Sequence, residues 1–473
     1  MANIKREHGA EQPYVPLGPF KFRLPFVHYN WTFPEAAQGA ILVAVPLAAT
    51  AVHMDVLGAS FEVAVLMVII NGLLYMLHVS LGDPIFPGWI TPIIPLVTPW
   101  AIGNFAEGTD RIHAIIALQM MIAVMFLVLG ATGLSKKIIQ IVPLSLRCGV
   151  ILGAAIAAIF SVVRPDAASR MHGVEISAIA GCIVAFTIMY SVRFALLKKQ
   201  VSLFAFIGKF GLLPGIVVAL IVGTVVGELP VPSINLADGI LVAFPFGELI
   251  AGYTVFGIGF PSANHFVQAL PMLFVAYLIC FGDFITSEAL LADAEKGRGD
   301  ERVEYNPDRS NLIVGIRNAI LAFIAPYAPL NGPIWVGGVV ATCERYKQGR
   351  SEMDSLYGGM SAYIFFMAIA ALFLPVVSLF RPALPVAMTI TMMVTGWACG
   401  FIAINMCKTR EEQGIALIMG IAIAFQSAAI GLAVGVLLHL FIGAPKPVPA
   451  VAAPAPAPAP VVAPASGDDK KST

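Results

Sequence analysis

Two interrupted apolar stretches decide the fold of this chain: FPGWITP at residues 86–92 and LNGPIWVGG at residues 330–338. Each lies third among the apolar segments of its half of the sequence. Glycine permits a sharp turn of the backbone, and proline fits the first turn of a helix because it has no N–H to leave unpaired. Two interrupted membrane segments in corresponding positions are typical of a transporter binding site.

The composition is that of a polytopic membrane protein. Hydrophobic residues make up 58% of the 473 residues and charged residues 12%, and the mean hydropathy is +0.86, too apolar for one water-soluble core. A formal net charge of +0 and the lack of a basic run interleaved with aromatic residues exclude nucleic-acid binding. The six cysteines lack metal-ligand spacing, so we expect no zinc, disulfide or other cofactor.

The apolar runs predict an all-α protein with fourteen transmembrane segments in two halves of seven. An odd number of spans per half requires the two halves to be inverted in the membrane. The third and tenth spans are expected to be broken, and their loose backbone groups to be satisfied inside the protein. The expected spans are 34–51, 61–79, 91–103, 112–133, 138–162, 174–192, 211–227, 271–292, 310–327, 333–344, 361–379, 384–405, 413–425 and 427–442.

The distribution of lysine and arginine predicts that both termini are cytoplasmic, since cytoplasmic loops are enriched in these residues. With that orientation the longest external segment contains no lysine or arginine. An N-terminal region that begins with polar residues does not have the layout of a cleavable signal peptide. The resulting domains are a cytoplasmic N-terminal segment (1–33), a first repeat (34–227), an external loop (228–270), a second repeat (271–443) and an Ala/Pro-rich cytoplasmic tail expected to be disordered (444–473).

Several motifs resemble one superfamily of membrane transporters. GAILVAVP at 39–46 looks like the opening of sulfate-permease-type anion transporters. FGDFITSE at 281–288 and NPDRSNLI at 306–313, followed by the second break, are similar to the second half of nucleobase–cation symporters and their anion-exchanger relatives. The match in order and spacing extends over residues 34–442.

The resemblance implies seven plus seven inverted spans. In this family a core domain of spans 1–4 and 8–11 moves against a gate domain of spans 5–7 and 12–14, commonly in homodimers. The chain departs from nucleobase symporters, because Ile279 stands where they carry a glutamate, and Val336 or Gly337 stands at the acid of their tenth span. Its Ala/Pro-rich tail at 444–473 is expected to be too short for the C-terminal regulatory domain usual in sulfate permeases.

The predicted site lies where the two breaks meet span eight. Helices that begin near the membrane midplane direct unpaired N–H groups and positive dipole ends at one cavity, which favours an anionic or polar substrate. Asp283 is deep in span eight, where an acid is costly unless it binds an ion or a substrate. Ser287 follows it on the same face, and Glu288 lies nearer the cytoplasm, as a second candidate for ion coupling.

The remaining candidates have structural alternatives. Asn331 either binds substrate or caps helix ten, and Gln38 aligns loosely with a pocket residue of the family. Trp89 and Trp335 either line the pocket or pack. The other candidate substrate contacts are Ile90, Thr91 and Gly332.

Two further polar residues receive structural interpretations. Arg317 is expected to extend from the cytoplasmic end of span nine toward water, and His78 to lie at the membrane interface.

The sequence therefore predicts an elevator-type secondary-active transporter of a small anion or weakly acidic polar solute in a bacterial inner membrane. Asp283 would bind the coupling H⁺ or Na⁺. An uncoupled anion channel or exchanger, and a membrane scaffold or sensor without transport, remain alternatives. No catalytic motif is present, so we do not expect an enzyme.

Overall fold

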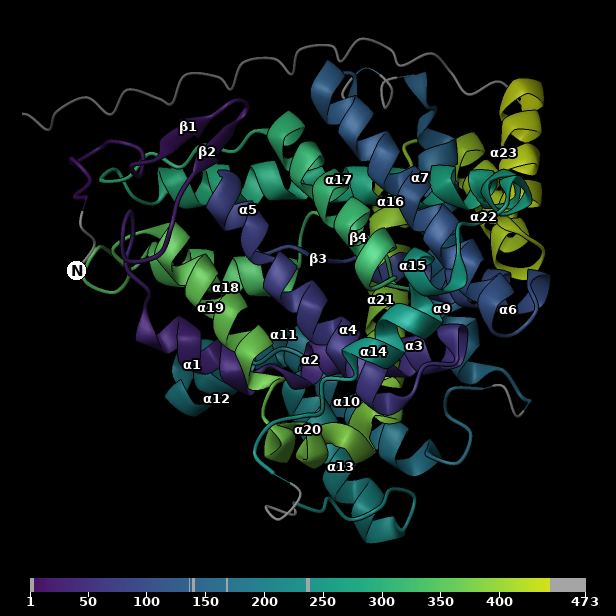
Figure 1. Ribbon diagram of the computed structural model, residues 1–473, viewed down its shortest axis with the longest axis horizontal. Helices are drawn as coiled ribbons and strands as arrows, with labels where there is room; N and C mark the ends of the chain where they lie inside the picture. The colour runs from purple at the N-terminus through teal and green to yellow at the C-terminus, as the bar shows by residue number, and fades with distance from the viewer. Residues whose placement is uncertain (1–3, 136, 138–140, 167–168, 235–238, 443–473) are drawn as a thin grey trace, which may run out of the picture.

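The structure is a computed structural model that describes residues 4–442 except 136, 138–140, 167–168 and 235–238. It is mostly helical, with two short two-stranded sheets (Figure 1). The expected tail at 444–473 lies outside the described residues. The first half contains β1 (Val15–Leu17), β2 (Phe20–Phe22), α1 (Phe33–Ile41), α2 (Ala44–Leu47), α3 (Ala49–Leu57), α4 (Phe61–Leu74), α5 (Met76–Leu81), β3 (Gly88–Trp89), η1 (Thr91–Ile93), α6 (Ile94–Asn104), α7 (Thr109–Thr132), α9 (Leu144–Val163), α10 (Glu175–Tyr190), α11 (Val192–Gln200), α12 (Ser202–Gly208) and α13 (Leu213–Val226).

The second half begins with two short helices and then a long one. Its elements are α14 (Phe246–Tyr253), α15 (Val255–Ile258), α16 (Ala263–Lys296), α17 (Pro307–Ile324), β4 (Asn331–Gly332), α18 (Val336–Tyr346), α19 (Leu356–Ala370), α20 (Leu374–Phe380), η3 (Arg381–Ala383), α21 (Leu384–Met406), α22 (Arg410–Phe425) and α23 (Ala428–Ile442).

Local capping residues fix several helix ends. Ser60 accepts a hydrogen bond from the Val63 N–H at the start of α4, and Asn306 accepts two at the start of α17. Thr409 and Glu412 form a reciprocal capping box at α22. These side chains satisfy N–H groups that have no partner within the first helical turn.

The helices pack in two groups. In the first, α1 packs on α19, and α7 packs on α16 and α17; in the second, α9 packs on α21 and α22, and α10 packs on α13 and α21. Small residues permit the close approach of α9 and α22, since a Cβ at Gly153 would lie 2.9 Å from Cβ of Ile423. In Figure 1 the first group includes α18 and α19 on the left and the second includes α22 and α23 on the right, with β3 and β4 near the centre.

Six helical segments are long and apolar enough to cross a membrane, or up to eight if each bent pair counts as one span. Every one of the fourteen expected spans overlaps a helix, but the count of fourteen stays a prediction. Two expected spans differ clearly from the observed helices. The helix expected from 271 begins at Ala263 and runs through Pro271, because neighbouring groups can satisfy the backbone that a proline frees in such a helix. The span expected over 361–379 is divided into α19 and α20.

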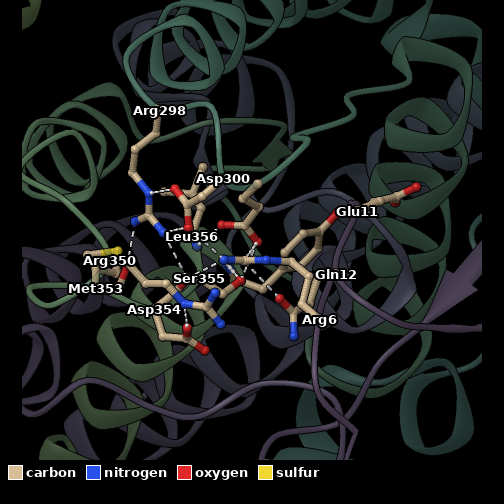
Figure 2. Close-up of polar contacts among 12 residues, drawn as sticks. Arg6, Glu11, Gln12, Arg298, Asp300, Arg350, Met353, Asp354, Ser355 and Leu356 are labelled. Carbon is tan, nitrogen blue, oxygen red and sulfur yellow. Dashed lines mark hydrogen bonds and ion pairs between the residues drawn. The ribbon is translucent and has the colours of Figure 1, made fainter. Parts of the chain in front are cut away.

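The N-terminal segment folds over the loops that follow α16 and α18. Figure 2 shows Arg6 and Arg298 reaching Asp300 and the backbone near Ser355. Nη2 of Arg6 donates to Oδ2 of Asp300 and to the Asp354 carbonyl, each at 3.0 Å. Nη1 of Arg6 lies 2.8 Å from Oε1 of buried Glu301. These contacts join the ends of helices from the first group.

Candidate functional site

The two sequence breaks meet as an antiparallel strand pair. Gly88 is opposite Gly332, and Trp89 is opposite Asn331. The pairing continues on both sides, because the Ile90 N–H donates to the Leu330 carbonyl at 3.1 Å and the Trp335 N–H donates to the Phe86 carbonyl at 2.7 Å. A Cβ at Gly88 would be tightly packed, since it would lie 3.0 Å from the Ile334 carbonyl oxygen. We call this strand pair, β3 with β4, the crossing.

Asp283 of α16 lies against one face of the crossing. A Cβ built on Gly332 would be 3.7 Å from Oδ2 of Asp283 and 3.2 Å from Cγ1 of Ile90. Asp283 is half-buried, and among the described residues its carboxylate has no ion-pair partner within 4.0 Å. The buried Ser287 hydroxyl donates to the Asp283 backbone carbonyl at 2.8 Å. The structure therefore brings Asp283, Ile90 and Gly332 together, with Ser287 one helical turn further along α16.

Asn331 is directed toward the other side of the crossing. Its Oδ1 accepts from Nη2 of Arg317 at 2.8 Å. Asn318 pairs with the Asn331 backbone, accepting from its N–H at 3.2 Å and donating to its carbonyl at 3.0 Å. Asn331 is thus held by α17, and in the described part of the chain its side chain has no hydrogen bond to Asp283.

The two tryptophans are in different aromatic groups. Trp89 stacks on Tyr327 with ring centroids 6.4 Å apart, and Tyr327 in turn contacts His53 of α3 edge-on at 4.6 Å. Trp335 lies edge-on to Phe86 at 5.0 Å and to Tyr363 at 6.0 Å. Trp335 is therefore part of the packing around the crossing, and half-buried Trp89 lies on the side of span one.

The remaining predicted residues lie at the edges of this arrangement or outside it. Thr91 is half-buried in η1, directly after β3. Nε2 of Gln38 donates to the Lys209 carbonyl at 3.1 Å, between α1 and the end of α12, so it is not gathered with Asp283. Glu288 is exposed and borders a small cavity with Ser135 and Asn311. In the described part of the chain, no group of three or more His, Cys, Asp or Glu side chains could hold a metal ion.

Sequence reasoning misplaced two polar residues. Arg317, expected to reach toward water, is fully buried, and its Nη1 lies 3.2 Å from Nδ1 of His78. His78, expected at the interface, is also fully buried. Span nine was expected to begin at 310, but α17 begins at Pro307. This places Arg317 past the middle of the helix, too deep for its side chain to leave the protein.

Comparisons with known proteins identify the fold. No family model matches the chain, and no curated protein matches it in sequence. The transmembrane domain of a cyanobacterium bicarbonate transporter, BicA, matches with a TM-score of 0.53 at 13% identity, over 85% of this chain and 97% of that one. The murine Solute Carrier 26 family member A9 anion transporter, in the inward-facing state, matches with a TM-score of 0.51 at 12% identity, over 86% of this chain and 67% of that one.

A second structure of SLC26A9 matches with a TM-score of 0.51 at 13% identity, over 86% of this chain, and this chain spans 65% of it. At these identities the likeness shows the fold. The chain therefore shares the transmembrane fold of these anion transporters, as its resemblance to sulfate-permease-type transporters predicted. Together with the long apolar helices, this fold makes the chain an integral membrane protein.

Proposed function

We propose that this protein is a secondary-active transporter of a small anion or a weakly acidic polar solute. The observation that carries the proposal is the pairing of β3 with β4 beside Asp283. The names of the matched proteins, a bicarbonate transporter and an anion transporter, point to the same substrate class. By the same likeness we assign it no enzymatic reaction.

The helix ends at the crossing favour a negative charge. Helix α18 begins at Val336, directly after β4, and η1 with α6 begins at Thr91, directly after β3. Neither start has a side-chain cap. Unpaired N–H groups and the positive dipole ends of two helices are then available to an anion in front of the crossing.

The helix packing has the symmetry expected of two inverted repeats, which supports an elevator movement. When each helix is replaced by its counterpart in the other half, the packed pair α1–α19 becomes the packed pair α16–α7, and the pair α9–α22 becomes the pair α21–α10. We propose that the fourteen segments form two inverted repeats, that the first helix group is the core and carries the crossing, and that the second group is the gate. The spans at β3–α6 and β4–α18 are the broken ones.

Asp283 is the proposed site of the coupling ion. An ionised carboxylate beside an anion site would repel the substrate, so H⁺ or Na⁺ on Asp283 makes anion binding more favourable. Ser287 is on the same helix face and offers a hydroxyl oxygen one turn away. Glu288, which is exposed nearer the cytoplasm, is a second candidate for the path of the ion.

Uptake into liposomes tests the proposal. The purified full chain should accumulate labelled bicarbonate, sulfate or chloride when a Na⁺ or H⁺ gradient is imposed. Asp283→Asn should abolish the dependence on the gradient, whereas Asp293→Asn, at the exposed end of the same helix, should retain it. Anion flux that ignores both gradients would favour the channel or exchanger, and a folded protein without any flux would favour the scaffold.

Three further assignments follow from the same proposal. We propose a homodimer in the lipid bilayer of a bacterial inner membrane, with both termini in the cytoplasm. The partners are the lipid bilayer and the small-molecule substrate, and no cofactor is required beyond the coupling ion. Reconstituted protein cross-linked in the membrane should yield a dimer.

A further inference from the structure

Arg317 is a fully buried cation behind the crossing, that is, on the α17 side, away from Asp283. Its Nη2 donates to Oδ1 of Asn331 at 2.8 Å, and its Nη1 donates to the Gly332 carbonyl at 3.3 Å and lies 3.2 Å from Nδ1 of His78. The guanidinium also lies over the ring of Tyr75, 4.7 Å from its centroid. None of these partners is a carboxylate, so the bonds hold the guanidinium in place without cancelling its charge.

The other deeply buried arginines that make ion pairs differ in this respect. Arg309 contacts Asp83 at 2.7 Å, Arg23 contacts Glu11 at 2.6 Å, and Arg298 contacts Asp300 at 2.5 Å. Within residues 4–442, apart from the gaps named above, no carboxylate lies within 4.0 Å of a nitrogen of Arg317. A buried charge without a counter-charge is costly, and arginine cannot lose its proton to avoid that cost. Its positive potential therefore persists at the crossing.

The hydrogen bonds around Asn331 add to this excess of donors. Guanidinium groups have no acceptor, so the oxygen of the Asn331 amide must face Arg317 and its NH₂ group must face elsewhere. Nδ2 of Asn331 and Nε of Arg317 are both buried and have no hydrogen-bond partner among the described residues. Two unpaired donors beside an uncompensated cation make this region favourable for negative charge and unfavourable for a second cation.

Gly332 connects this charge to the proposed site. Arg317 donates to the carbonyl of Gly332, and Asp283 lies beside the Cα of the same residue. The two side chains therefore flank one peptide of β4, with α17 behind it and α16 on the other side. Two charges on either side of one peptide interact appreciably inside a protein, where the effective dielectric constant is about 20.

We propose that Arg317 is the permanent positive charge of the anion site, held behind β4 and acting on the substrate through the Asn331–Gly332 segment. This inference rests on the proposed function and adds a residue that sets its preference for anions. Arg317 is a positioning residue, because it touches the strand and not the substrate. When Asp283 carries the coupling ion, the charge of Arg317 is left for the transported anion to balance.

Asn331→Asp is the sharpest test. Aspartate retains the oxygen that accepts from Arg317, so the strand stays anchored, but it places a carboxylate against the guanidinium and cancels its charge. We expect this variant to fold and to bind chloride, bicarbonate and sulfate at least about tenfold more weakly, since one unit charge near a partly buried site is worth that much or more. Asn405→Asp, the same change at an exposed position of α21, should leave anion affinity unchanged.

Two substitutions of Arg317 separate charge from shape. Arg317→Lys keeps the charge with fewer hydrogen bonds and should retain anion affinity within a few-fold. Arg317→Gln keeps a donor and loses the charge, and it should match the loss in Asn331→Asp. Affinity is read as anion-dependent thermal stabilisation and as the KM for uptake, with the maximal rate measured separately, because a purely structural role would not divide the variants by charge.

Each result decides the proposal. Wild-type anion affinity in folded Asn331→Asp overturns it, and so does a loss in Arg317→Lys as large as the loss in Asn331→Asp, which would mean that shape controls binding. If Arg317→Gln does not fold, the other two variants still decide between charge and shape. A wild-type protein that neither binds nor moves any of the three anions would instead refute the proposed transport function, and this inference with it.

Discussion

At Gly332, the space for one methyl group separates β4 from the carboxylate of Asp283. A Cβ there would contact Oδ2 of Asp283 at 3.7 Å and approach Cγ1 of Ile90 at 3.2 Å, so Ile90 would have to shift by only a few tenths of an ångström. The fold should therefore tolerate alanine at a cost of about 1 kcal/mol, the usual size for a single substitution. The methyl group would nevertheless occupy the place that we propose for an ion on Asp283 or for an anion.

We predict that Gly332→Ala folds but loses most of its stabilisation by Na⁺ or by anions. Thermal unfolding of the purified protein with and without each ion checks this. Gly103→Ala in α6 is the control, because a Cβ there has no neighbour within 4 Å. Full ion-dependent stabilisation of Gly332→Ala would show that the site is not in front of Gly332.

The contact between α1 and α19 depends on Gly39 in a different way. A Cβ at this position would lie 2.3 Å from the carbonyl oxygen of Tyr363, and backbone cannot move aside cheaply. Alanine stabilises an exposed helix by up to about 1 kcal/mol relative to glycine, but overpacking a tight contact costs about 1–3 kcal/mol. The clash should dominate.

We therefore expect Gly39→Ala to lower the unfolding temperature and to separate α1 from α19. Gly247→Ala in α14, where a Cβ meets nothing within 4 Å, should leave that temperature unchanged or raise it slightly. Differential scanning calorimetry of the two variants in detergent checks the pair. Equal unfolding temperatures would contradict the close packing of these helices.

The sequence predicted some elements well and others poorly. Residues 86–92 and 330–338 were recognised because glycine and proline interrupt an apolar pattern, and Asp283 because a deep acid is unusual. Their meeting in a two-residue strand pair could not be predicted, since so short a pairing has no alternating pattern and its strands are far apart in sequence. Arg317 was misjudged because a start error of three residues in α17 is nearly a full turn of helix.

At the scale of the whole molecule, the N-terminal segment links the loops that follow α16 and α18 in the first helix group. Arg6 reaches the loop after α16 at Asp300 and the loop after α18 at Asp354. The Arg23 N–H donates to the Ser80 carbonyl at the end of α5 at 2.8 Å. If this helix group moves as one body during transport, these links keep its loops from separating.

Two acids that contact Arg6 of this segment have pKa values shifted in opposite directions. The hydrogen bond from Arg298 lowers the pKa of Asp300, so the contribution of Asp300 to stability is present at neutral pH and is lost as pH falls through its folded pKa. Burial raises the pKa of Glu301 despite the attraction of Arg6, so ionisation of Glu301 opposes folding as pH rises through its folded pKa. Arg6 is what makes the ionised form of Glu301 tolerable.

Replacing Arg6 should therefore release the N-terminal segment in a pH-dependent way. In Arg6→Gln, ionised Glu301 has lost its buried partner, and breaking a buried ion pair from one side costs about 3–5 kcal/mol. Relative to wild type at the same pH, amide hydrogen exchange over residues 4–30 should rise sharply in buffer above the folded pKa of Glu301 and less in buffer below it, where Glu301 is protonated. Lys5→Gln, an exposed neighbour, is the control and should exchange like wild type. A release equally strong at both pH values would mean that the Arg6 hydrogen bonds to Asp300 and Asp354 hold the segment, and not its charge on Glu301.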